Sequence, residues 1–107
     1  MTAIPLAAFV ALSAVLLGIG IFGILTRRNF ILLLIAIEVA MNSAILNFVV
    51  FGAYWGAVPG YGLEGQSVAV VLVGLAATEV AVGLAIVLGL NRLKGTINVA
   101  QATELKE

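Results

Sequence analysis

The 107-residue sequence is 64% hydrophobic and 9% charged, and its formal net charge of zero gives no electrostatic basis for binding nucleic acid. Because about a quarter of the residues of a water-soluble domain are charged, this composition excludes soluble enzymes and predicts an integral membrane protein. The chain contains no Cys and no His, so it lacks the usual ligands of metal and iron–sulfur sites, and we expect it to bind no metal or cofactor by itself.

Three apolar runs are long enough to cross a bilayer, which takes a helix of about 20 residues. They cover residues 4–25, 30–51 and 68–90. The first run lacks the basic start of a signal peptide and is too long to be one, which predicts a retained span. The sequence therefore predicts an all-α integral membrane fold, with residues 1–107 forming a single domain of three transmembrane helices.

The first span carries small residues at helical spacing along one face. They are Ala7, Ala11, Ala14 and Gly18. Small side chains let a second helix approach closely, so this face is predicted to pack against another span.

The segments between the spans predict how the helices are oriented. Residues 26–29 (TRRN) form a tight cytoplasmic turn, residues 52–66 a Gly-rich outer loop, and residues 91–107 a polar cytoplasmic tail. The outer loop has no basic residue. All basic residues lie in the turn and the tail: Arg27, Arg28, Arg92, Lys94 and Lys106. The positive-inside rule then predicts that the N-terminus lies outside and the C-terminus in the cytoplasm.

The second and third spans each contain an acid, Glu38 and Glu79, far from every basic residue of the chain. An ionised side chain at the bilayer centre costs at least about 2.5–3.5 kcal/mol. The acids are tolerable if they are protonated, if a cation of another polypeptide pairs with them, or if they line a hydrated cavity. Each case suits a group that takes up and releases a proton. The structural alternative is a neutral Glu that hydrogen-bonds two helices together.

Other polar residues flank these acids. Asn42 follows Glu38 by one turn on the same face and can share a hydrogen bond or a water with it. Asn47 lies on the opposite side, toward another helix, and Thr78 is expected to bond to its own helix. The pair Arg27–Arg28 can be a topology signal that contacts lipid headgroups, or it can dock a neighbouring subunit or steer protons.

Four stretches of the sequence carry a resemblance to a known family. They are LTRRNFILLLIAIEVAMNSAILNFV (25–49), EGQ (64–66), AATEVAVGLAIVLGLNR (76–92) and the tail ending in ELKE. The sequence closely resembles subunit K of the complex I family, the small three-helix membrane subunit of NADH–quinone oxidoreductases and their relatives. The resemblance covers almost the whole chain, although the 52–66 loop looks longer than is usual in the family.

The resemblance implies a function for the intramembrane acids. Glu38 and Glu79 correspond to the two intramembrane glutamates of the family, which relay protons in a pump that couples quinone reduction to proton translocation. Arg27 and Arg28 match a basic pair in the cytoplasmic turn that affects activity. Flavin, iron–sulfur clusters and quinone would belong to partner subunits, and the partners would be antiporter-like and quinone-site membrane subunits. The expected location is the cytoplasmic (inner) membrane rather than a thylakoid or organellar membrane.

Three other functions fit a small membrane protein. The related small component of multisubunit cation/proton antiporters has the same three helices but lacks acids at these two positions. A small multidrug transporter would need four spans and an acid in its first helix. A non-catalytic assembly subunit would tolerate replacement of both glutamates.

Overall fold

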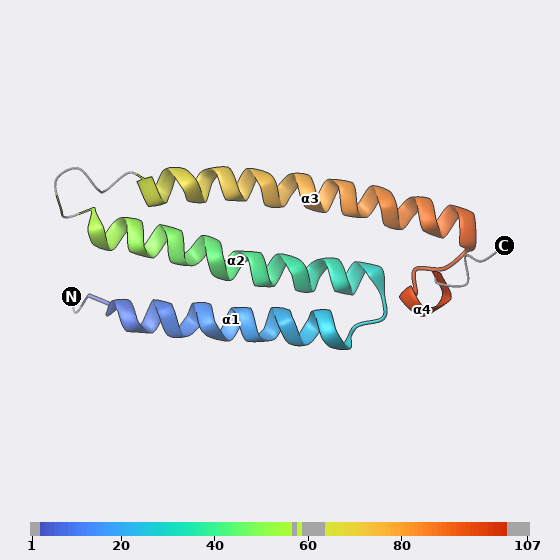
Figure 1. Ribbon diagram of the computed structural model, residues 1–107, viewed down its shortest axis with the longest axis horizontal. Helices are drawn as coiled ribbons and strands as arrows, with labels where there is room; N and C mark the ends of the chain where they lie inside the picture. The colour runs from blue at the N-terminus through green and yellow to red at the C-terminus, as the bar shows by residue number, and fades with distance from the viewer. Residues whose placement is uncertain (1–2, 57, 59–63, 103–107) are drawn as a thin grey trace.

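The computed structural model describes residues 3–56, 58 and 64–102. Three long helices run side by side, followed by one short helix (Figure 1). They are α1 (Leu6–Thr26), α2 (Phe30–Trp55), α3 (Glu64–Lys94) and α4 (Val99–Ala102). The three long helices are long and apolar enough to cross a membrane. These findings confirm the predicted all-α fold with three transmembrane helices; which ends face the cytoplasm remains a prediction.

The helices extend beyond the predicted apolar runs. α2 continues to Trp55 and α3 begins at Glu64, so both helices enter the predicted outer loop of residues 52–66. Counting apolar residues marks only the part of a helix that lies in hydrocarbon, whereas its polar ends can remain helical in the interface. The rest of the predicted loop, residues 57 and 59–63, lies outside the described residues apart from Val58.

The segment predicted as a polar tail is also largely structured. α3 continues to Lys94, and the chain then turns at Gly95, whose φ of 66° lies in the left-handed region that favours glycine after a helix. The N–H of Gly95 donates to the carbonyl of Asn91 at 2.8 Å. α4 follows after this turn, and residues 103–107 lie outside the described part of the chain.

The long helices form one layer rather than a closed bundle. α2 lies between α1 and α3 and packs against both, whereas α1 and α3 make almost no contact with each other (Figure 1). A single layer of helices has no interior, so large apolar side chains such as Phe22 and Val70 remain 63% and 73% exposed. Apolar surface on this scale indicates that lipid or other protein chains cover both faces of the layer.

The contact between α1 and α2 differs from the predicted one. Ser13 and Gly20 of α1 are buried against α2, whereas Gly18 of the predicted small-residue face is exposed, with nothing near the position of a Cβ. The other members of that face, Ala7, Ala11 and Ala14, are also exposed. The Ser13 face fits better because its hydroxyl donates to the carbonyl of Ser43 at 3.0 Å and its glycine lets the backbones meet.

The contact between α2 and α3, here called the α2–α3 seam, is fixed near both ends by glycines. At one end a Cβ on Gly65 would lie 2.7 Å from the Cα of Gly52, and at the other a Cβ on Gly83 would lie 2.7 Å from a side-chain carbon of Leu34. Between them lies the apolar core of buried residues. It consists of Ile45, Ala69 and Ala76, with Met41 and Leu72 packed against it. The seam therefore has one register along its length.

Candidate functional site

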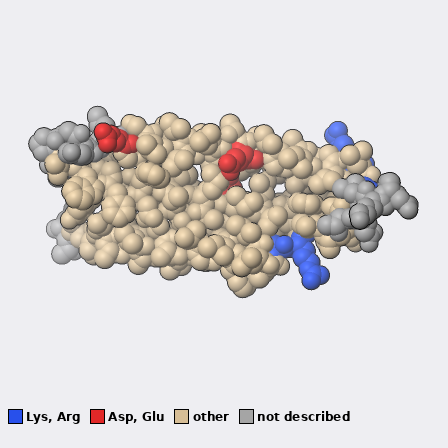
Figure 2. All heavy atoms as spheres, viewed as in Figure 1, with Lys and Arg blue, Asp and Glu red and all other residues tan. Residues whose placement is uncertain are grey.

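Glu38 and Glu79 lie at the same level on the two sides of the seam. Leu34 of α2 lies opposite Gly83 of α3. One turn from Leu34 toward Gly52 is Glu38, and one turn from Gly83 in the same direction is Glu79. Because the helices are antiparallel and in register, the two carboxylates come from adjacent helices at equal depth. In Figure 2 acidic side-chain atoms lie near mid-length, far from the basic end of the molecule.

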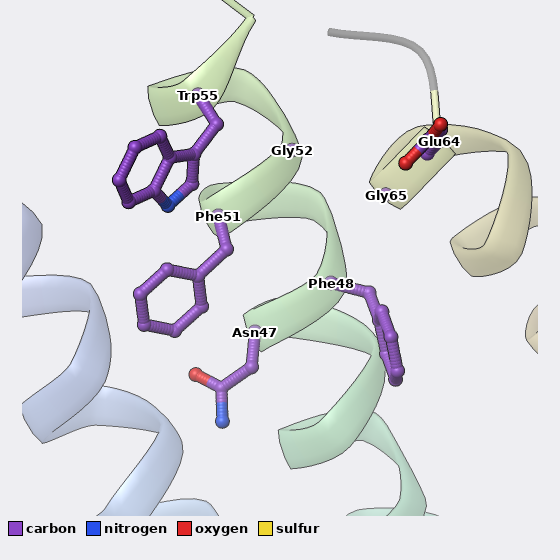
Figure 3. Close-up of a pocket in the computed structure, with 7 residues that line it drawn as sticks. All are labelled: Asn47, Phe48, Phe51, Gly52, Trp55, Glu64 and Gly65. Atoms are coloured by element: carbon purple, nitrogen blue, oxygen red, sulfur yellow. The ribbon is translucent and has the colours of Figure 1, made fainter. Parts of the chain in front are cut away.

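Two concave sites mark the two faces of the layer at the end where α2 stops and α3 starts. One, the Trp55 pocket, has a volume of about 400 Å³ and is shown in Figure 3. It is lined by Asn47, Phe48, Phe51, Gly52, Trp55, Glu64 and Gly65. The other, the Val49 groove, has a volume of about 490 Å³. It is lined by Ile45, Val49, Gln66, Ala69, Val70 and Val73.

The pocket and the groove lie on opposite sides of the α2–α3 seam. Consecutive residues of a helix point about 100° apart. Phe48 lines the Trp55 pocket and its neighbour Val49 lines the groove, while Gly52 marks the seam between the two directions.

Helical spacing places the two glutamates on different faces of the layer. Glu38 precedes Val49 by a whole number of turns, so it lies on the groove side of α2. Glu64 of the Trp55 pocket, Leu75 and Glu79 follow one another at helical spacing, so Glu79 lies on the pocket side of α3. The carboxylates thus flank the seam from opposite faces.

Neither glutamate is enclosed by this chain. Glu38 is half-buried and Glu79 is exposed, whereas the sequence predicted two buried acids. The difference follows from the single-layer fold, because depth in a membrane gives no burial within a chain that has no interior. Among the described residues neither carboxylate accepts a hydrogen bond or pairs with a cation. Any partner in the membrane must be water, lipid or another chain.

The described basic residues lie together at one end of the molecule (Figure 2). They are Arg27 and Arg28 in the α1–α2 turn and Arg92 and Lys94 at the end of α3, all of them exposed. The same residues predicted the orientation of the helices, and their positions agree that the turn and the end of α3 share one side of the membrane. No basic side chain in the described ranges comes near Glu38 or Glu79.

The other polar residues of the spans have separate contacts. Thr78 donates its hydroxyl to the carbonyl of Leu75 at 2.7 Å, which confirms the predicted bond within its own helix. Asn42 is exposed, one turn from Glu38, and no hydrogen bond joins them. Asn47 is half-buried and lines the Trp55 pocket on the other side of α2. No group of three or more His, Cys, Asp or Glu within the described ranges could hold a metal ion.

Comparison with known proteins decides the family. Residues 8–107 match the NADH-ubiquinone/plastoquinone oxidoreductase chain 4L family. The chain belongs to this family. It is 42% identical over 106 residues to the NADH-quinone oxidoreductase subunit K of Ectopseudomonas mendocina, covering 99% of each chain. It is 40% identical, with the same coverage, to the subunit of that name from Azotobacter vinelandii. These matches confirm the resemblance stated from the sequence.

Membership of the chain 4L family defines the role of this chain at a coarse level. It is a small, multi-pass membrane subunit of an oxidoreductase and functions with other subunits. The sequence identified the two glutamates and the arginine turn but missed the residues that position them. Gly20, Gly23 and Asn98 do so through backbone contacts, and their residue types alone gave no signal of those contacts.

Proposed function

We propose that this subunit relays protons across the three-helix layer, within an oxidoreductase that couples quinone reduction to proton translocation. The observation that carries the proposal is the placement of Glu38 and Glu79. They lie at equal depth on opposite faces, and neither has a partner within the described chain. Two unpaired acids at one depth are costly in a membrane, and that cost is offset if each is neutral or paired for part of a cycle.

The chemistry needs only carboxyl groups and water. A carboxyl on one face accepts a proton from a neighbouring donor, and a water between the helices passes a proton to the carboxyl on the other face, which releases it. Ala76 and Gly83 lie on the Glu79 side chain's flanks along α3, one turn either way, and small residues leave room for such a water. Glu38 and Glu79 then act in series.

The other subunits supply what this chain lacks. With no Cys and no His, the chain cannot hold an iron–sulfur cluster by the usual ligands, so we assign those clusters, the flavin and the quinone to partner subunits. The cations that pair with the two acids would come from antiporter-like and quinone-site subunits, one on each face of the layer. Arg27 and Arg28, which are exposed in the turn, are available to dock a partner or steer protons on the cytoplasmic side of an inner membrane.

A double variant, Glu38→Gln with Glu79→Gln, tests the proposal against a purely structural role. Gln keeps the size and hydrogen bonds of Glu but cannot carry a proton at neutral pH. We expect the complex to assemble and proton uptake into inverted membrane vesicles during NADH oxidation to fall by at least about tenfold. Full proton uptake by this variant would show a non-catalytic assembly subunit, and proton movement that did not require electron transfer would show an antiporter.

A further inference from the structure

The segment after α3 folds back onto the turn between α1 and α2. The N–H of Phe30 donates to the carbonyl of Ile97 at 2.9 Å, and the N–H of Val99 donates to the carbonyl of Arg28 at 2.7 Å. These two bonds make an isolated antiparallel bridge in which Asn29 lies opposite Asn98. The bridge joins residues that are distant in the sequence, at the basic end of the layer (Figure 1).

Each partner in the bridge also caps a helix. The side-chain oxygen of Asn29 accepts from the N–H of Ile31 at 2.9 Å and of Leu32 at 3.3 Å, at the start of α2. The side-chain oxygen of Asn98 accepts from the N–H of Ala100 at 2.9 Å, at the start of α4. Such caps hold the backbone of the capping residue in an extended conformation, which is the conformation that a bridge needs.

Side-chain contacts hold the returning segment in shape. The hydroxyl of Thr96 accepts from the N–H of Asn98 at 3.1 Å and donates to the side-chain oxygen of Gln101 at 2.5 Å. Ala102, the last residue of α4, is buried. Residues 96–102 therefore form a compact unit rather than a free tail.

We infer that residues 96–102 are a clasp that fixes the arginine turn and the start of α2 against the end of α3. Through Arg28 the clasp holds the backbone of the turn, and through Phe30 it holds the first residue of α2. The other end of the seam is fixed by Gly52 and Gly65. The clasp thus closes the register that sets Glu38 level with Glu79, and Asn98 and Val99 are positioning residues for the proposed relay, on which this inference rests.

Closure of the clasp can be measured directly because the sequence contains no Cys. Asn29 and Asn98 form the pair that is not bonded to each other in an antiparallel bridge, in which Cα atoms lie about 4.5 Å apart and side chains are close. That separation lies in the range of disulfides. In the assembled complex, Asn29→Cys with Asn98→Cys should give a disulfide within this chain under mild oxidation.

Val99→Pro opens the clasp with little other change. Val99 is the first residue of α4, where proline is tolerated, and the substitution removes the N–H that donates to Arg28. Val99→Ala is the matched control because it keeps that N–H. In the double-cysteine background, we expect Val99→Pro to slow disulfide formation by about three- to tenfold, as loss of one hydrogen bond implies, and Val99→Ala to leave it unchanged.

Proton uptake links the clasp to the relay. We expect Val99→Pro to lower the protons moved per NADH oxidised, and oxidation of the cysteine pair to restore that ratio in the same variant, because the disulfide closes the clasp without the hydrogen bond. A cysteine pair that does not cross-link overturns the clasp, whatever the glutamates do. Cross-linking with normal coupling in Val99→Pro overturns its positioning role. A failed relay would show separately, as normal pumping in the glutamate variants with an intact disulfide.

Discussion

Replacing Glu38 with Gln is expected to reduce proton pumping and coupled quinone reduction by at least about tenfold while the complex still assembles. Glu38 is half-buried beside the α2–α3 seam and has no hydrogen-bond partner in the described chain, so the change breaks no contact that holds the helices together. The loss would therefore come from the missing proton site. Proton uptake and NADH oxidation in inverted vesicles measure it, with a native gel to check assembly.

Two further variants separate the proton from the side chain. Glu38→Asp keeps an ionisable group and should retain more pumping than Glu38→Gln, although the shorter side chain reaches less far across the seam. Glu64→Gln makes the same chemical change at an exposed position of the Trp55 pocket, at the end of α3 and away from the level of Glu38. It should pump normally. Equal losses in Glu64→Gln and Glu38→Gln would contradict a specific role for Glu38.

Replacing Gly20 with Ala is expected to destabilise the assembled complex, because α1 and α2 touch at this residue. A Cβ on Gly20 would lie 2.7 Å from the backbone nitrogen and 2.8 Å from the Cα of Ala40, and backbone atoms cannot rotate away. Forcing extra volume into such a contact typically costs about 1–3 kcal/mol. We expect less assembled complex in the membrane and faster inactivation on heating, both readable on native gels.

Gly18→Ala is the matched control for Gly20→Ala. It adds the same methyl group two residues earlier on α1, where nothing lies within 4 Å of the new atom. It removes a glycine from the same helix, so any effect of helix propensity is shared by the two variants. Normal assembly of both variants would show that α1 and α2 are less closely packed than the structure has them.

The sequence was sufficient for the fold class because span length and apolar content are properties of single segments. It also located the intramembrane acids, since a Glu in an apolar run is visible without coordinates. It did not predict which face of α1 meets α2. Ala7, Ala11, Ala14 and Gly18 make a row as regular as the one containing Ser13 and Gly20, and only the hydroxyl bond to Ser43 and the glycine contacts with Ala36 and Ala40 decide between them.

The relation between the two glutamates could not be predicted either. Rotation of each helix about its axis depends on contacts between helices, and here Leu34 with Gly83 and Gly52 with Gly65 set it. The fold of residues 96–102 was missed for a related reason. A polar segment that follows the last span gives no apolar pattern, and its structure depends on a backbone bridge to the distant Asn29.

The most direct measurement is infrared difference spectroscopy of the assembled complex, comparing the resting state with steady turnover. A carboxyl group that gains or loses its proton changes its C=O stretching band. We predict a carboxyl band that changes during turnover in the wild type and is missing in Glu38→Gln, with a second band missing in Glu79→Gln. Difference spectra with no carboxyl band assignable to either residue would show that both acids keep one protonation state, and proton relay by this subunit would then be wrong.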